Sequence, residues 1–133
     1  MPYSAMKASD ISITWSLARA LAPYNITVNC ICPGHIYTPL WERGATAFLT
    51  YLRETKRKGE KLPAFRGRNL ENVDLESMTP KELWLKFIVL PITPNGREQT
   101  PEDIGKAVVF FVSDDAKNIT GQVLHVDGGT TMR

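Results

Sequence analysis

The chain has 133 residues, of which 43% are hydrophobic and 23% are charged, and its formal net charge is +2 at pH 7. This length suits one compact domain, and the balance of apolar and charged residues excludes an intrinsically disordered chain. A net charge this small gives no reason to expect a nucleic-acid or membrane partner, and no apolar run approaches the roughly 20 residues that a membrane span needs.

The N-terminus and the cysteines bear on the cellular compartment. The first ten residues, MPYSAMKASD, lack the basic and apolar regions of a secretory signal. Cys30 and Cys32 stand two residues apart in a predicted strand, which puts them on one face and in poor geometry for a disulfide bond. A Cys-x-Cys pair without further ligands is weak evidence for a metal, so no metal site is predicted and both thiols are interpreted as small buried apolar groups. These features predict a cytoplasmic protein.

The first quarter of the chain predicts one helix followed by one strand. Apolar residues at helical spacing predict the helix over residues 4–22, ended by Pro23. Its apolar stripe consists of Ile11, Trp15, Ala18 and Ala22. The next segment, 26–32 (ITVNCIC), is nearly all apolar and rich in β-branched residues, which predicts a strand covered on both faces in a parallel sheet. Pro33-Gly34 ends this strand.

Residues 39–96 have a different character and predict a helical insert. The first helix of the insert is predicted from a stripe of Trp41, Ala45, Phe48, Leu49 and Leu52. A basic stretch over residues 53–68 follows, and then a polar passage to Ser77 that is expected to be mobile. Thr79-Pro80-Lys81-Glu82 has the layout of a capping box, so a second helix is predicted to start there.

The last third repeats the order of helix and strand. Thr100-Pro101-Glu102-Asp103 again predicts a helix start, and a strand over residues 122–126 is closed by Asp127-Gly128-Gly129. Helix, strand, insert, helix and strand form an α/β pattern. Only two strands are evident, which is a poor basis for a self-sufficient doubly wound domain.

Tyr3 and Lys7 are candidates for acid–base chemistry at the start of the first helix. Residues four apart on a helix lie on one face, one turn from each other. A tyrosine hydroxyl is a poor acid–base group near neutral pH, but a neighbouring ammonium and the helix N-terminus both favour the phenolate. Such a hydroxyl can give a proton to a carbonyl oxygen while a cofactor delivers hydride.

Three blocks of sequence extend this candidate into a family resemblance. They are Tyr3-Ser4-Ala5-Met6-Lys7-Ala8, the strand 28–34 followed by Ile36, Thr38 and Pro39, and Thr120-Gly121 with Val126-Asp127-Gly128-Gly129. In this order they resemble the short-chain dehydrogenase/reductase family, well at both ends of the chain and weakly between residues 42 and 94. The resemblance implies the C-terminal part of a doubly wound, Rossmann-like parallel sheet. It implies a catalytic helix, strand and nicotinamide-side loop over 1–38, a substrate lid over 39–96 and a final helix and strand over 97–133.

The resemblance also implies roles for single residues. Tyr3 is similar to the family's proton donor, and Lys7 to the lysine that assists it and binds the nicotinamide ribose. The other cofactor-binding residues implied are Pro33, Gly34, Ile36 and Thr38, while Asn29 belongs to a structural strand motif. Tyr37 and Trp41 are candidates for lining a substrate pocket, although aromatic residues at helical spacing more often form core. These roles imply an oxidoreductase that uses NAD or NADP to interconvert an alcohol and a carbonyl in a small molecule, as a homo-oligomer in its full-length form.

Departures from the family pattern keep a second hypothesis open. The Gly-rich phosphate loop, the residue that reads the adenosine ribose and the catalytic serine have no counterpart in this sequence, so the 133 residues alone are expected to be inactive. The alternative is a non-catalytic remnant that acts as an oligomerisation or interaction module. Such a remnant would present an open edge of strand 26–32 and the apolar face of helix 4–22 to partners.

Two further features have competing interpretations. His35, in the loop after the first strand, either orients substrate or faces solvent, and the second is favoured; His125 is interpreted as packed or edge-exposed. The basic stretch 53–68 either attracts a phosphorylated or CoA-type substrate or nucleic acid, or is a solvated face. Because it lacks interleaved aromatic residues for base stacking, the solvated face is favoured and no nucleic-acid partner is predicted.

Overall fold

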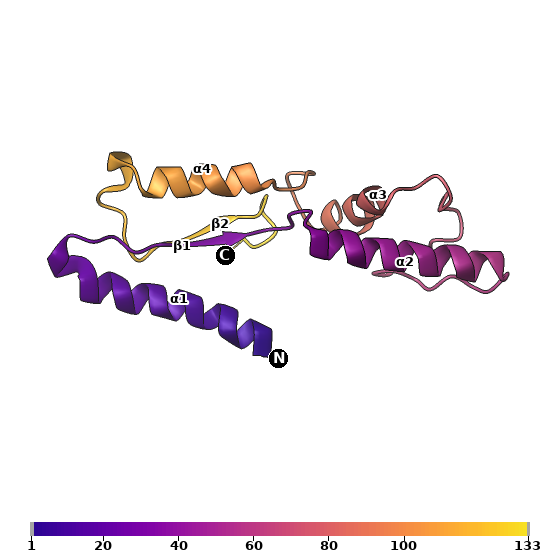
Figure 1. The fold of residues 1–133 in the computed structure, drawn as a ribbon, viewed down its shortest axis with the longest axis horizontal. Coiled ribbons are helices and arrows are strands. Elements are labelled where there is room, and N and C mark those ends of the chain that lie inside the picture. Colours follow the sequence, from indigo (N-terminus) through magenta and orange to yellow (C-terminus); the bar gives the residue numbers. More distant parts are fainter. Residues whose placement is uncertain (1, 133) are drawn as a thin grey trace. The chain divides into compact units, whose positions relative to one another are not determined.

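A computed structural model describes residues 2–132 of the chain (Figure 1). The chain forms two compact units, one from Met1–Gly34 with Gln99–Arg133 and the other from His35–Glu98. The longer elements are α1 (Pro2–Leu21), β1 (Cys30–Pro33), α2 (Pro39–Arg57), α3 (Pro80–Trp84), α4 (Pro101–Phe111) and β2 (Val123–Val126). The shorter helical turns are η1 (Ala22–Tyr24), η2 (Leu85–Val89) and η3 (Asp114–Ala116). Over residues 2–132, no helix has both the length and the apolar composition to cross a membrane.

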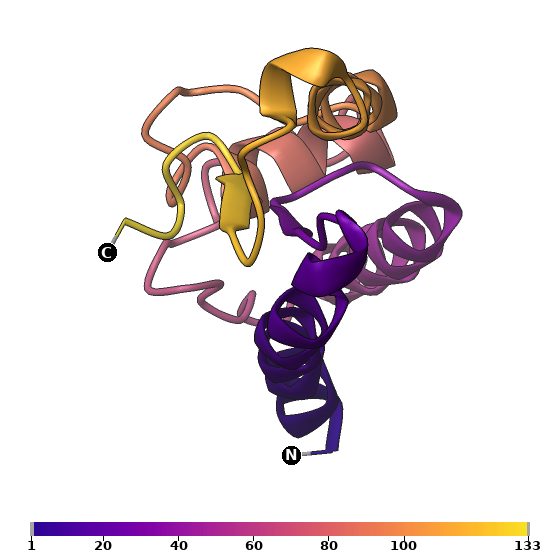
Figure 2. The same ribbon diagram turned by 90° about the vertical axis from the view of Figure 1, so that its left-hand side faces the viewer.

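The first unit is built on a two-stranded parallel sheet. β1 pairs with β2 so that Cys30 lies opposite Val123 and Pro33 lies opposite Val126. α1 and α4 lie on opposite sides of this sheet (Figures 1 and 2). The predicted α/β class and the parallel pairing of two strands are therefore confirmed.

The first strand is shorter than the sequence predicts. It begins at Cys30 and not at residue 26, because the pairing with β2 starts there. Ahead of it, the Val28 N–H donates to the Thr120 hydroxyl over 3.0 Å, and the Asn29 amide group donates to the Ile119 carbonyl over 2.8 Å. These side-chain hydrogen bonds join the segment to the residues before β2, together with one backbone bond from the Gly121 N–H to the Val28 carbonyl over 2.7 Å. The structural role predicted for Asn29 is confirmed. The prediction of a strand over the whole of residues 26–32 was wrong.

Much of the apolar surface of the first unit is exposed. In α1 only Thr14 and Ala18 are buried, and Trp15, placed on the apolar stripe by the sequence, is half exposed. Val109 and Val112 of the α4 segment are also exposed. The expected coverage of the first strand on both faces is not reached, since Cys30, Ile31 and Cys32 are only half-buried.

The second unit contains the larger hydrophobic core. Leu49 and Leu52 of α2 pack with Leu83 and Trp84 of α3, and all four side chains are buried. Thr79 caps α3 as predicted: its hydroxyl accepts from the Glu82 N–H and the Glu82 carboxylate accepts from the Thr79 N–H. After Trp84 the helix widens into a π-turn, in which the Leu90 N–H donates to the Leu85 carbonyl over 2.9 Å.

Part of the basic stretch has a structural task that the sequence analysis missed. The Arg53 guanidinium donates to the carbonyl oxygens of Leu75, Glu76 and Met78 over 2.8–3.0 Å. The Lys56 ammonium donates to the Val73 carbonyl over 3.2 Å, and Arg57 forms an ion pair with Glu76. The passage expected to be mobile is thus tied to α2, and these three cations are bound within the unit. That use favours a structural interpretation of the basic stretch over ligand attraction.

Candidate active site

Tyr3 and Lys7 lie on the first two turns of α1. Pro2 occupies the first helical position, where its fixed φ and missing N–H favour helix initiation. The Tyr3 side chain is 73% exposed, and that of Lys7 is 61% exposed. Because α1 runs antiparallel to β1, its first turns lie toward the carboxyl end of β1, where Pro33-Gly34 follows (Figure 1). Ligands of open α/β sheets bind at that end of the strands.

The ammonium of Lys7 has a partner that the sequence analysis missed. Its Nζ donates to Oδ2 of Asp10 over 3.0 Å, one turn further along α1. This hydrogen bond, and after it the charge of Asp10, raise the pKa of Lys7 above its ordinary value. The spacing of three residues between a lysine and an aspartate marks Asp10 as one possible partner, because such pairs face each other on a helix.

Two free thiols lie on the neighbouring strand. Cys30 and Cys32 are half-buried, because β1 is only partly covered. The sequence had predicted that both side chains would be buried. Burial, followed by the adjacent Cys30, raises the pKa of the Cys32 thiol. A raised pKa keeps this thiol protonated and poorly nucleophilic near neutral pH. Among residues 2–132, no three His, Cys, Asp or Glu side chains are arranged to hold a metal ion.

The turn after β1 is packed against the turn after β2. The Gly34 N–H donates to the Val126 carbonyl over 3.0 Å. A β-carbon added at Gly34 would lie 2.6 Å from the Asp127 Cα and would also meet Oε1 of Gln99. The need for glycine at this position therefore follows from packing inside the first unit.

Asp127 organises the turn that closes the first unit. Its carboxylate accepts from the N–H groups of Gly129 and Thr131 over 2.9 and 2.8 Å. Burial alone would raise the pKa of Asp127, but these hydrogen bonds outweigh it and hold the pKa below its ordinary value. Gly128 and Gly129 have φ values of 64° and 88°, which glycine adopts without strain.

The remaining cofactor-binding candidates, Ile36 and Thr38, belong to the second unit. Ile36 is half-buried, and Thr38 is exposed at the N-cap of α2. The Thr38 hydroxyl makes no capping hydrogen bond to the helix.

Tyr37 and Trp41, the substrate candidates, form part of an aromatic cluster in the second unit. The Tyr37 and Trp84 ring centroids are 5.0 Å apart, and those of Trp41 and Trp84 are 6.1 Å apart. Burial, followed by the charge of Glu42, raises the pKa of Tyr37. Tyr37 and Trp41 therefore pack against the core, and each is half-buried.

The two histidines have different surroundings. The His35 ring lies 5.9 Å from the Trp41 ring and is half-buried, so its interpretation as a solvent-facing side chain was wrong. The packing of its flat ring against Trp41 accounts for the difference. His125 is exposed on β2, with Nδ1 3.9 Å from the Asp127 carboxylate. Of the two interpretations, packed or edge-exposed, the structure selects the second.

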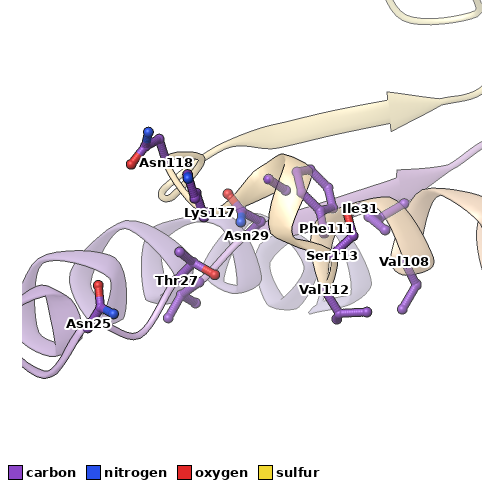
Figure 3. Close-up of a pocket in the computed structure, with 12 residues that line it drawn as sticks. Asn25, Thr27, Asn29, Ile31, Val108, Phe111, Val112, Ser113, Lys117 and Asn118 are labelled. Carbon is purple, nitrogen blue, oxygen red and sulfur yellow. The ribbon is translucent and has the colours of Figure 1, made fainter.

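A cavity of about 620 Å³ lies in the first unit beside β1. Figure 3 shows that the lining residues come from the segment around β1, such as Asn29 and Ile31, and from the α4 segment, such as Val108, Phe111 and Val112. Tyr3 and Lys7 do not line it. The cavity therefore does not contain the acid–base pair, and its lining combines apolar side chains with polar ones such as Asn29 and Lys117.

Comparison with known proteins places these features in a family. Residues 1–74 and 86–131 match the family described as Enoyl-(Acyl carrier protein) reductase. The chain is 35% identical to the 3-oxoacyl-(acyl-carrier-protein) reductase of Chlamydia trachomatis over 127 residues, which cover 96% of this chain and 36% of that protein. It is 32% identical to the acetoacetyl-CoA reductase of Rhizobium meliloti over 127 residues, which cover 96% of this chain and 38% of that protein.

A solved structure supports the same assignment. The crystal structure of L-sorbose reductase from Gluconobacter frateurii, in complex with NADPH and L-sorbose, matches with a TM-score of 0.68 and 26% sequence identity. The match covers 98% of this chain and 41% of that protein. The chain thus spans well under half the length of these relatives. With matches over nearly its whole length, it belongs to the short-chain dehydrogenase/reductase family of oxidoreductases.

Proposed function

We propose that this chain carries the acid–base and nicotinamide-side residues of an NAD(P)-dependent oxidoreductase that interconverts an alcohol and a carbonyl. The observation that carries the proposal is the position of Tyr3 and Lys7. Both side chains are exposed on the first two turns of α1, toward the carboxyl end of β1. The family assignment supports the same chemistry, since its members named above are reductases.

The proposed roles of Tyr3 and Lys7 follow from proton transfer. In the direction of reduction, NADH or NADPH, when bound, would supply a hydride for the carbonyl carbon, and the electrons of the C=O π bond would pass to the carbonyl oxygen. The Tyr3 hydroxyl gives its proton to the carbonyl oxygen, and the resulting phenolate regains a proton from solvent. The Lys7 ammonium stabilises this phenolate, because opposite charges a few ångströms apart attract.

The residues present fit the nicotinamide end of such a cofactor. In the first unit, the exposed Lys7 ammonium would hold it by a hydrogen bond. In the second unit, the family resemblance points to the Thr38 hydroxyl, which makes no capping hydrogen bond. The resemblance points to backbone groups of Gly34 and Ile36 as further contacts. The half-buried rings of Tyr37 and Trp41 would contact the substrate.

Calorimetry of NADPH and NADH binding tests how much of the cofactor site these 133 residues contain. We expect the 133-residue chain to bind either dinucleotide much more weakly than a version extended to the length of its relatives. The reason is that its sequence contains no Gly-rich loop to cradle the pyrophosphate. Equally tight binding by both proteins would contradict this account.

We propose self-association as a second function, on the strength of the apolar surface of the first unit. β1 pairs with β2 along one edge, and within residues 2–132 no strand covers its other edge. The cavity between the β1 and α4 segments is partly lined by apolar side chains, and the exposed Val109 and Val112 add to the apolar surface. Open edges and contiguous apolar patches bind other polypeptides, and the proposed occupant is a second copy of the chain.

Static light scattering on the 133-residue chain tests this second function. We expect a concentration-dependent oligomer that Val112→Lys disrupts, because an ammonium in an apolar interface is desolvated without a partner. Val112 is 79% exposed, and Met132, which is 78% exposed outside the cavity lining, provides the matched control Met132→Lys. A monomer at all concentrations, or equal effects of both substitutions, would rule out self-association through this surface.

A further inference from the structure

Lys7 lies between two possible partners on α1. Tyr3 is one turn before it, and Asp10 is one turn after it. Side chains on a helix lean toward its N-terminus, so a free Lys7 side chain would lean toward the turn that carries Tyr3. The 3.0 Å contact between Nζ and the Asp10 carboxylate instead draws the ammonium toward the following turn.

We propose that Asp10 is a positioning residue of the active site, which holds the Lys7 ammonium and so limits its stabilisation of the Tyr3 phenolate. This inference rests on the proposed function, in which Tyr3 gives and takes the proton. Asp10 acts in two ways, by competing for the ammonium and by adding a negative charge of its own near the phenol. Both effects oppose formation of the phenolate.

The other ionisable groups of the first unit leave Asp10 as the main influence on Lys7. The hydrogen bond and the charge of Asp10 are the largest causes of the raised pKa of Lys7, and the charges of Tyr3 and Cys30 contribute less. On the sheet, burial and then Cys30 raise the pKa of the Cys32 thiol, and the charges of Asp127 and of Asp10 on α1 contribute less. His125 lies near Asp127. No other carboxylate is within ion-pair distance of the Lys7 ammonium among residues 2–132.

The Asp10→Asn substitution isolates the charge. The amide has nearly the same shape as the carboxylate but cannot form an ion pair, so the ammonium is released and one negative charge is lost. We expect the tyrosinate of Tyr3 to form at a lower pH in this variant than in the unmodified chain, because a negative charge on the same helix is lost and the ammonium is released. The pH at which the Lys7 Nζ titrates, followed by NMR, is expected to fall as well.

Ultraviolet absorbance of tyrosinate on the 133-residue chain provides the readout. Subtracting the titration of a Tyr3→Phe variant isolates the signal of Tyr3 from the other three tyrosines. Asp10→Glu retains the negative charge and is expected to keep the midpoint close to that of the unmodified chain. Asp115→Asn is the matched control, since Asp115 is an exposed carboxylate of the same unit that lies outside α1.

The outcomes separate this inference from the proposed function. A Tyr3 midpoint that does not move in Asp10→Asn, or that moves as much in Asp115→Asn, would overturn the role of Asp10. Circular dichroism establishes that the variants remain helical. The titration needs neither cofactor nor turnover. A lack of reductase activity would therefore count against the proposed function without changing what the titration shows about Asp10.

Discussion

Replacing Tyr3 with phenylalanine is expected to lower kcat/KM for carbonyl reduction by about 10²- to 10⁴-fold, the usual contribution of a positioned acid–base group. The substitution removes only the hydroxyl, which is the proposed proton donor. The Tyr3 side chain is 73% exposed, so losing the hydroxyl leaves the packing of α1 unchanged. The measurement uses a version of the protein extended to the length of its relatives, with NADPH and NADH as reductants and acetoacetyl-CoA as the probe.

Tyr24→Phe is the matched control for this experiment. Tyr24 is also 73% exposed and belongs to the same unit, but it lies in η1 at the opposite end of α1. Its substitution is expected to leave kcat/KM unchanged. Undiminished reduction by the Tyr3→Phe variant would show that Tyr3 is not the acid, and the proposed mechanism would then fail.

Replacing Gly34 with alanine is expected to lower the free energy of unfolding by about 1–3 kcal/mol, the usual cost of overpacking. The added methyl group would lie 2.6 Å from Cα and 2.8 Å from Cβ of Asp127, closer than carbon atoms can approach. The backbone cannot easily move away, because the Gly34 N–H is bonded to the Val126 carbonyl and Asp127 is held by its own hydrogen bonds. Chemical denaturation followed by circular dichroism measures the loss.

Gly105→Ala separates this clash from a general effect of losing a glycine. Gly105 lies in the middle of α4, and a β-carbon there would have no neighbour within 4 Å. Alanine is a better helix former than glycine by about 1 kcal/mol, so this variant is expected to be more stable than the unmodified chain. A Gly34→Ala variant that is as stable as Gly105→Ala would contradict the close packing of the two turns.

Local sequence signals determined the helices and the class of fold. Thr79 and Thr100 cap their helices as the pattern of threonine, proline and an acidic residue predicts, because such caps depend only on residues within one turn. The spacing of Tyr3 and Lys7 likewise places both on α1. The order of helices and strands was enough to predict a parallel α/β sheet.

Tertiary contacts decided the features that the sequence could not specify. The first strand begins at Cys30 because β2 pairs from there, and an apolar run cannot show where its partner strand starts. The passage after α2 is tied down because Arg53 reaches carbonyl oxygens more than 20 residues away. Residues 35–38, grouped with the first strand by the resemblance, belong to the compact unit of the insert. The partner of Lys7 could not be predicted from the sequence either, because both Tyr3 and Asp10 are spaced to meet Lys7 on the helix. Only the conformation of the Lys7 side chain selects the Asp10 carboxylate.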